Sequence, residues 1–329
     1  MRRALLPWLI ATGIAVLAAA ATVAVLNATA FGASSFVRIY LDALARDDVS
    51  DALTLPGVRP SAEGADAAGA NAPSAALLQD GTLAGLRDIR ITGDEDRGGV
   101  HLITVDWTAS HGSGTSSFQI ERIGTRFGLF PEWGFVVSPM ATVALTVAHD
   151  PRFTVNGVDE VSGTRENTPV AYAVLVPGVY SFAHRSRYLT AVPDVVVADT
   201  VNQTLRATVN TQANPTFVAT VSSLVNDTLR ECATQEVLFP TGCPFGQSVQ
   251  DRVSSTPAWS IVAQPRLAIV PGATFGSWAI PSTPGTAHLR VGVTSLFDGT
   301  SSTFDQDVPF RVQGDVALGP NDAISVVLK

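Results

Sequence analysis

The N-terminal part of the chain lacks charge over an unusually long stretch. No charged side chain occurs between Arg3 and Arg38, and residues 4–26 (ALLPWLIATGIAVLAAAATVAVL) are almost wholly apolar. A helix of about 20 apolar residues can cross the hydrocarbon core of a bilayer. Arg2 and Arg3 precede this run and no basic residue follows it closely, which favours a cytoplasmic N-terminus. We therefore expect residues 4–26 to anchor the chain in the cell membrane as a single-pass helix, with the domains that follow it extracellular.

A cleaved signal peptide is the alternative interpretation of residues 1–30. The small residues of Ala28-Thr29-Ala30 fit the pattern that precedes a cleavage site. The apolar run is longer than the core of about 7 to 15 residues that signal peptides have, which favours a retained anchor. Both interpretations place residues 31–329 outside the cytoplasm.

Lysine is nearly absent, since Lys329 is the only one beside twenty arginines. Schiff-base chemistry, P-loop nucleotide binding and Ser-Lys hydrolysis all need an internal lysine, so the sequence excludes them. The net charge of −8 argues against binding to nucleic acid or attraction to an anionic lipid surface. So strong a preference for arginine is typical of GC-rich coding, as in actinobacteria.

Cysteine is also scarce, with Cys232 and Cys243 as the only two. Thiols outside the cytoplasm meet an oxidising environment, and two in one chain usually pair. A redox pair would favour Cys-x-x-Cys spacing, and a metal site would need more His or Cys nearby. We expect a structural disulfide that stabilises the fold by about 3 kcal/mol.

The fold class that we predict is a multidomain chain of α+β and all-β parts after the transmembrane helix of residues 1–30. Residues 31–139 form a helix-plus-antiparallel-sheet unit. Its helix is capped by Ser34 or Ser35 and has one apolar face, and its flexible loop covers residues 56–75. The apolar face consists of Phe36, Ile39, Tyr40 and Leu44.

The remaining residues predict a small β-sandwich and a second helix-plus-antiparallel-sheet unit. Residues 140–213 are rich in Val and Thr and have no helical period, which favours the sandwich. Residues 214–329 begin with Asn214-Pro215, a good N-cap followed by proline at the first helical position. The apolar positions of that helix repeat every three or four residues: Val218, Val221, Val225, Leu229 and Cys232.

One segment of the predicted sandwich resembles a known family of modules. FTVNG at 153–157, Gly163, Thr168-Pro169 and LVPGVYSF at 175–182 resemble a PEGA-type β-module. The whole layout is similar to TcaA-like membrane proteins of Gram-positive bacteria, although no zinc-ribbon cysteines precede the membrane helix. The resemblance implies a non-enzymatic role in the cell envelope, linked to wall stress, and supplies no catalytic residue.

No motif in the sequence predicts an active site. There is no Gly-x-Ser-x-Gly elbow and no glycine-rich nucleotide fingerprint. Asp305 and Asp307 share one face of a strand, which is more typical of a solvated surface than of acid–base catalysis. We expect no metal and no cofactor, because the five histidines are scattered along the chain: His101, His111, His149, His184 and His288.

Aromatic residues suggest where a ligand could bind. Trp107 and Trp133 lie in the first predicted sheet, where core packing is the simpler interpretation. The alternative is a concave, aromatic-lined sheet face beside Arg122 and Arg126, whose guanidinium groups could pair with a carboxylate of a wall peptide.

Taken with the export signal, these features predict an envelope protein that binds or scaffolds a wall component or another envelope protein. A structural spacer for an unseen partner and a hydrolase with a dispersed active site are the alternatives.

Overall fold

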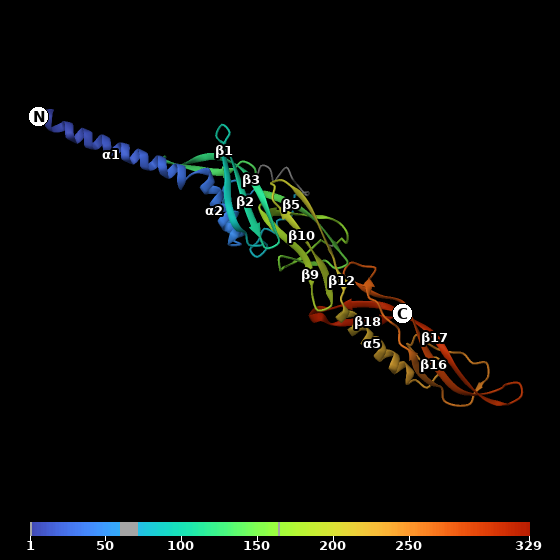
Figure 1. Cartoon of the computed structure of the whole chain (residues 1–329). Coiled ribbons are helices and arrows are strands. Elements are labelled where there is room, and N and C mark those ends of the chain that lie inside the picture. The colour runs from blue at the N-terminus through green and yellow to red at the C-terminus, as the bar shows by residue number, and fades with distance from the viewer. Residues whose placement is uncertain (1, 60–71, 164) are drawn as a thin grey trace.

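The computed structural model describes residues 2–59, 72–163 and 165–329, apart from the side chains of residues 2–11, 28 and 320. The molecule is elongated, with the N-terminal helix projecting from one end and the C-terminal unit forming the other (Figure 1). The helices that the structure describes before the first strand are α1 (Arg2–Thr29), α2 (Ala33–Ala45) and α3 (Val49–Ala52). Within the residues whose side chains the structure describes, there is no helix that is both long and apolar enough to cross a membrane.

Helix α2 differs from its prediction in its cap and in its buried face. Gly32 is the N-cap and makes no side-chain capping bond, so capping by Ser34 or Ser35 is wrong. Ile39 is 57% exposed, whereas Val37 and Leu41 are fully buried. Ile39 lies on the exposed side of the helix together with the charged residues Arg38 and Asp42, so the buried face is turned away from these two residues.

The first sheet is an antiparallel meander, as predicted. Its strands lie in the order β1 (Arg87–Asp96), β2 (Val100–Ala109), β3 (Gly112–Arg126) and β4 (Phe130–Phe135). Residues 60–71 of the predicted flexible loop lie outside the described residues. Both described ends of that loop are hydrogen-bonded to strands. The Phe135 amide of β4 donates to the Pro56 carbonyl, and Ser74 forms a β-bridge with Tyr172 of the sandwich.

Two facing sheets form the β-sandwich that the sequence predicts. One sheet has the order β12-β10-β9-β6-β7 and the other has the order β11-β5-β8. Strands β5 and β11 pair in parallel, although every other pair is antiparallel among the described residues. The strands are β5 (Met140–Ala148), β6 (Arg152–Val155), β7 (Val158–Val161), β8 (Val170–Leu175), β9 (Gly178–Arg185), β10 (Leu189–Ala198), β11 (Thr204–Asn210) and β12 (Gln212–Ala213).

The first sheet and the sandwich share one hydrophobic core. Buried side chains from Ala33 to Val209 form a single cluster, so the boundary drawn at residues 139 and 140 falls inside it. The hydroxyl of Tyr40 in α2 crosses that boundary and donates to the Val176 carbonyl at 2.7 Å. The two parts therefore pack as one body.

The C-terminal unit packs one helix on a long twisted sheet. Helix α5 (Pro215–Ala233) is capped by Asn214, whose side chain accepts from the Phe217 amide. Phe217 rather than Val218 begins its buried stripe. The described strands are β13 (Arg252–Val253), β14 (Ala258–Ala263), β15 (Val270–Pro271), β16 (Trp278–Thr294), β17 (Ser301–Leu318) and β18 (Ile324–Leu328).

The C-terminal core is separate from the first, but the two units are joined by direct contacts. Tyr188, just before β10, belongs to the second core and stacks on Phe217 of α5 with ring centroids 5.4 Å apart. The Asn214 amide donates to the Tyr188 carbonyl, and the Gly276 amide donates to the His149 carbonyl. These contacts hold the C-terminal unit in line with the sandwich.

Candidate functional site

Two of the four predicted ligand residues line one groove. Trp133 and Arg126 border a hollow of about 390 Å³ at the junction of α1, α2 and the first sheet. The indole of Trp133 is half-buried, and its Nε1 donates to the Phe31 carbonyl at 2.7 Å. The full lining, which we call the Trp133 groove, is Ala30, Phe31, Gly32, Phe36, Ile39, Pro56, Ile123, Arg126, Pro131, Glu132 and Trp133.

The other two predicted ligand residues do not line this groove. Arg122 lies opposite Trp133 in the β3–β4 register, but its exposed side chain donates to the Gly124 carbonyl. Trp107 is 2% exposed and donates from Nε1 to the Ser116 hydroxyl at 3.0 Å. Its ring packs over Gly114, where an added Cβ would lie 2.9 Å from the indole. Trp107 is therefore part of the core.

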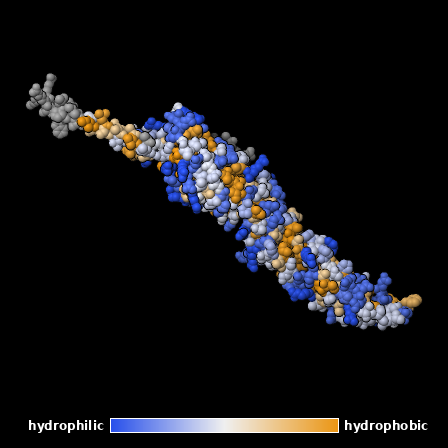
Figure 2. All heavy atoms as spheres, viewed as in Figure 1, coloured by the Kyte–Doolittle hydropathy of each residue, from blue (hydrophilic) through white to orange (hydrophobic). Residues whose placement is uncertain are grey.

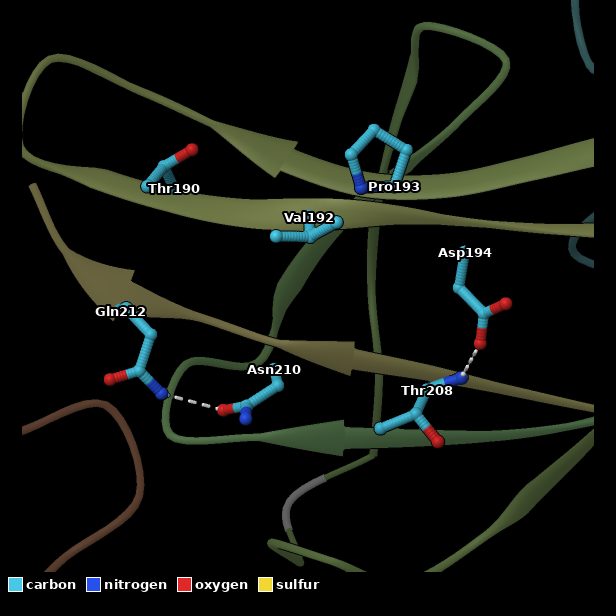
Figure 3. Close-up of a pocket in the computed structure, with 7 residues that line it drawn as sticks. All are labelled: Thr190, Val192, Pro193, Asp194, Thr208, Asn210 and Gln212. Atoms are coloured by element: carbon cyan, nitrogen blue, oxygen red, sulfur yellow. Dashed lines mark hydrogen bonds between the residues drawn. The ribbon is translucent and has the colours of Figure 1, made fainter.

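A second cleft opens between the edges of the two sandwich sheets (Figure 3). It measures about 590 Å³ and is lined by Val192, Pro193 and Asp194 of β10 and by residues of β11 and β12. The Asp194 carboxylate accepts from the Thr208 amide at 2.8 Å. Strand β10 pairs with β12 only at Leu189 and Thr190, so the rest of β10 is an open sheet edge. A shifted register, a proline and an inward carboxylate protect such an edge from pairing with another chain. This arrangement accounts for the cleft without a ligand.

A charged cluster that the sequence did not predict lies on the C-terminal hairpin. The imidazole of His288 on β16 contacts two carboxylates of β17, with Nδ1 2.8 Å from Asp307 and Nε2 2.7 Å from Asp305. The Asp307 hydrogen bond, with help from Asp305, raises the pKa of His288 above its ordinary value. Asp305 and Asp307 share a face because both carboxylates contact the same imidazole.

This cluster predicts a pH-dependent contribution to stability. Because the pKa of His288 is higher in the folded protein than in the unfolded chain, protonation of His288 stabilises the fold. This stabilisation is complete at pH values below the unfolded pKa of about 6.5. The contribution disappears as the pH rises through the raised pKa. We expect His288→Gln to lower the melting temperature more at about pH 5.5 than at about pH 9, measured by thermal unfolding. The Asp305→Asn, Asp307→Asn variant should lose the same pH dependence, and an equal effect of His288→Gln at both pH values would contradict the assignment.

A buried carboxylate in the sandwich is fully paired. Asp150 is 2% exposed and accepts two bonds of 2.8 Å from the Arg152 guanidinium and one from the Arg152 amide. Burial alone would raise the pKa of Asp150, but the Arg152 hydrogen bonds outweigh burial and lower it. The pair holds the start of β6 in place and leaves no carboxylate oxygen poised for catalysis. Within the described ranges, no group of three or more His, Cys, Asp or Glu side chains is arranged so that it could hold a metal ion.

Within the part of the chain that the structure describes, the most exposed aromatic side chains lie at two hairpin tips. Phe127 between β3 and β4 is 82% exposed, and Phe297 between β16 and β17 is 99% exposed. Leu129 and Leu296 accompany them at 56% and 74% exposure. The signal was present in the sequence, because FGLF and SLFDG place large apolar residues where turns usually hold small or polar ones.

The predicted disulfide is present, with Cys232 at the end of α5 bonded to Cys243.

Comparison with protein families, with curated sequences and with solved structures gives no match for this chain.

Proposed function

We propose that this chain is a single-pass membrane protein whose extracytoplasmic part acts without catalysis, as a binding or scaffolding protein of the cell envelope. The observation that carries the proposal is the placement of apolar residues at opposite ends of an elongated body. Helix α1 projects at one end, and the exposed hairpin tip with Phe297 lies at the other (Figure 1). Such a molecule can hold a binding tip at a distance from a membrane.

The exposed surface of α1 supports the anchoring part of the proposal. Large apolar side chains in the described part of the helix are exposed, with Ile14, Val16 and Leu17 each more than 60% exposed. Figure 2 shows hydrophobic residues along the projecting part of the helix. Contiguous exposed apolar surface indicates contact with a membrane or a protein partner. The charge-free run of residues 4–26 and the preceding Arg2 and Arg3 favour the membrane with a cytoplasmic N-terminus.

The disulfide and the sandwich support the extracytoplasmic and envelope parts. Disulfides persist outside the reducing cytosol, and Cys232–Cys243 fits that environment. The turns quoted for the PEGA-type resemblance occur at strand junctions, with Asn156-Gly157 between β6 and β7 and Pro177-Gly178 leading into β9. The resemblance to TcaA-like proteins of Gram-positive bacteria suggests a wall component as the ligand.

The distal tip is the binding surface that we propose. Leu296 and Phe297 cap the β16–β17 hairpin, whose strands pair from Trp278↔Val316 to Thr294↔Ser301. A long paired hairpin is stiff enough to present its tip, and exposed aromatic side chains frequently contribute most to a binding interface. The proposed ligand is a peptidoglycan component.

Binding to isolated cell-wall sacculi tests this proposal. The full chain in lipid nanodiscs should co-sediment with sacculi in a saturable way. Changing Leu296 and Phe297 together to serine should weaken binding about tenfold, since losing an anchoring aromatic costs on the order of 1.4 kcal/mol or more. Val161→Ser is the matched control, because Val161 is 65% exposed on the sandwich. Equal binding by all three proteins would exclude the tip as the site, and absence of binding would favour a spacer.

A further inference from the structure

The hairpin that joins β3 to β4 carries an apolar tip in a strained conformation. Phe127 has a φ of +54° and Gly128 a φ of +69°, so a bulky residue occupies the left-handed region. Asn, Asp or Gly would form this turn at lower cost. The side chain gains nothing from burial in the fold, because Phe127 is 82% exposed. Strain that the fold does not need indicates a role for the residue outside the fold.

Direct contacts fix the position of this tip along α1. The Asn27 side chain donates from Nδ2 to the Leu129 carbonyl at 3.0 Å. The rings of Phe31 and Phe130 stack with centroids 4.3 Å apart, and Trp133 donates to the Phe31 carbonyl. The hairpin therefore runs back along the last turns of the helix, as Figure 1 shows.

This contact sets the depth of the tip relative to the apolar run. The run ends at Leu26, so Asn27 is the first polar residue after it. Since the Leu129 carbonyl is hydrogen-bonded to Asn27, the tip lies level with the end of the run. If residues 4–26 cross a bilayer, Phe127 and Leu129 reach its interfacial layer.

The charges around the tip suit that layer. Arg126 lies with its guanidinium 5.7 Å from the centroid of the Phe127 ring, and Arg122 is exposed on the same strand. Phe and Leu side chains bury at the boundary between headgroups and acyl chains, and arginine can extend toward lipid phosphates from there. Glu132 is also exposed nearby, and the whole chain carries −8. Contact between the tip and the bilayer therefore does not depend on long-range electrostatic attraction. Because α1 tethers the tip close to the bilayer, the local concentration of the tip at the bilayer surface is high.

We propose that the tip of this hairpin, Phe127 to Leu129, inserts into the interface of the same phospholipid bilayer that α1 crosses. The inference rests on the anchoring part of the proposed function. A second attachment beside the helix would restrain the tilt of the body and hold the distal tip away from the membrane.

Fluorescence quenching by lipids tests the insertion. Phe127→Cys, Leu129→Cys, Ile14→Cys and Phe297→Cys are each labelled with a thiol-reactive nitrobenzoxadiazole in the full chain, whose own two cysteines are paired. The proteins are reconstituted in vesicles of phosphatidylcholine and phosphatidylglycerol that contain nitroxide-labelled lipid. Quenching in the bilayer does not depend on which way the protein is oriented. Phe297 is the matched control, since it is an exposed aromatic at the other end of the molecule.

The expected result is severalfold stronger quenching at positions 14, 127 and 129 than at 297. Quenching at 14 without quenching at 127 and 129 would overturn the insertion and leave the anchor intact. Absence of quenching at 14 would overturn the proposed anchor and the insertion with it. A blue-shifted emission at 127 without lipid quenching would indicate a protein contact, such as a second copy, and would also overturn the insertion.

Discussion

Replacing Tyr40 with alanine should destabilise the first sheet and the sandwich together by about 3 to 5 kcal/mol. The Tyr40 side chain is fully buried, and its ring packs against Phe118 and Phe135 with centroids 6.0 and 5.0 Å away. Its hydroxyl donates to the Val176 carbonyl at 2.7 Å, and the Pro139 carbonyl lies 3.3 Å from the same hydroxyl. The variant loses these ring contacts and leaves the Val176 carbonyl without the hydroxyl donor, whereas the Pro139 carbonyl still accepts from the Val176 amide.

Hydrogen exchange read by mass spectrometry measures this effect by segment. Protection should fall equally in residues 87–135 and 140–210 and stay unchanged in residues 215–328, because the C-terminal unit has its own core. Tyr40→Phe should cost about 1 to 2 kcal/mol, since it removes the hydroxyl alone. Ile39→Ala, on the exposed side of α2, should cost less than about 0.5 kcal/mol. A loss of protection confined to residues 33–135 would show that the two parts fold independently.

The sequence predicted the structure well where the alternation of apolar and polar residues within a single strand determines which side chains are buried. The alternation of Ile103, Val105 and Trp107 predicts strand β2, and these three residues form its buried face. The same alternation already indicated that Trp107 belongs to the core. For α2 the predicted face was out of phase because it followed the apolar residues alone, whereas the charged Arg38 and Asp42 mark the exposed side.

Long-range pairings were beyond the reach of the sequence. The parallel pairing of β5 with β11 joins residues about sixty positions apart, and no local signal specifies it. The His288 cluster depends on the register of two long strands, which places Asp307 opposite His288 and Asp305 opposite Arg290. The contact of Asn27 with Leu129 likewise joins segments that are distant in the chain. Candidate sites built from such contacts emerge only once the strands are assembled.

Removing the disulfide should have the second large effect, confined to the C-terminal unit. The bond joins the last turn of α5 to a loop with few backbone hydrogen bonds, and Cys232 is 3% exposed. Closing a loop of this size restricts the unfolded chain by about 3 kcal/mol. The Cys232→Ser, Cys243→Ser variant should therefore melt roughly 10 °C lower in the transition of that unit.

Calorimetry of the full chain with and without reductant checks this prediction. The reduced wild-type protein should match the double variant, and the transition of residues 33–209 should not move. The Gln235 side chain supplies the internal comparison, because it accepts from the Thr241 amide inside the same loop and remains in the variant. Gln235→Ala should cost about 1 kcal/mol, well below the effect of the disulfide. If reduction leaves the melting temperature unchanged, packing of α5 on its sheet is sufficient for the unit. If it lowers the temperature as expected, the C-terminal unit depends on an oxidising environment, which agrees with the proposed extracytoplasmic location.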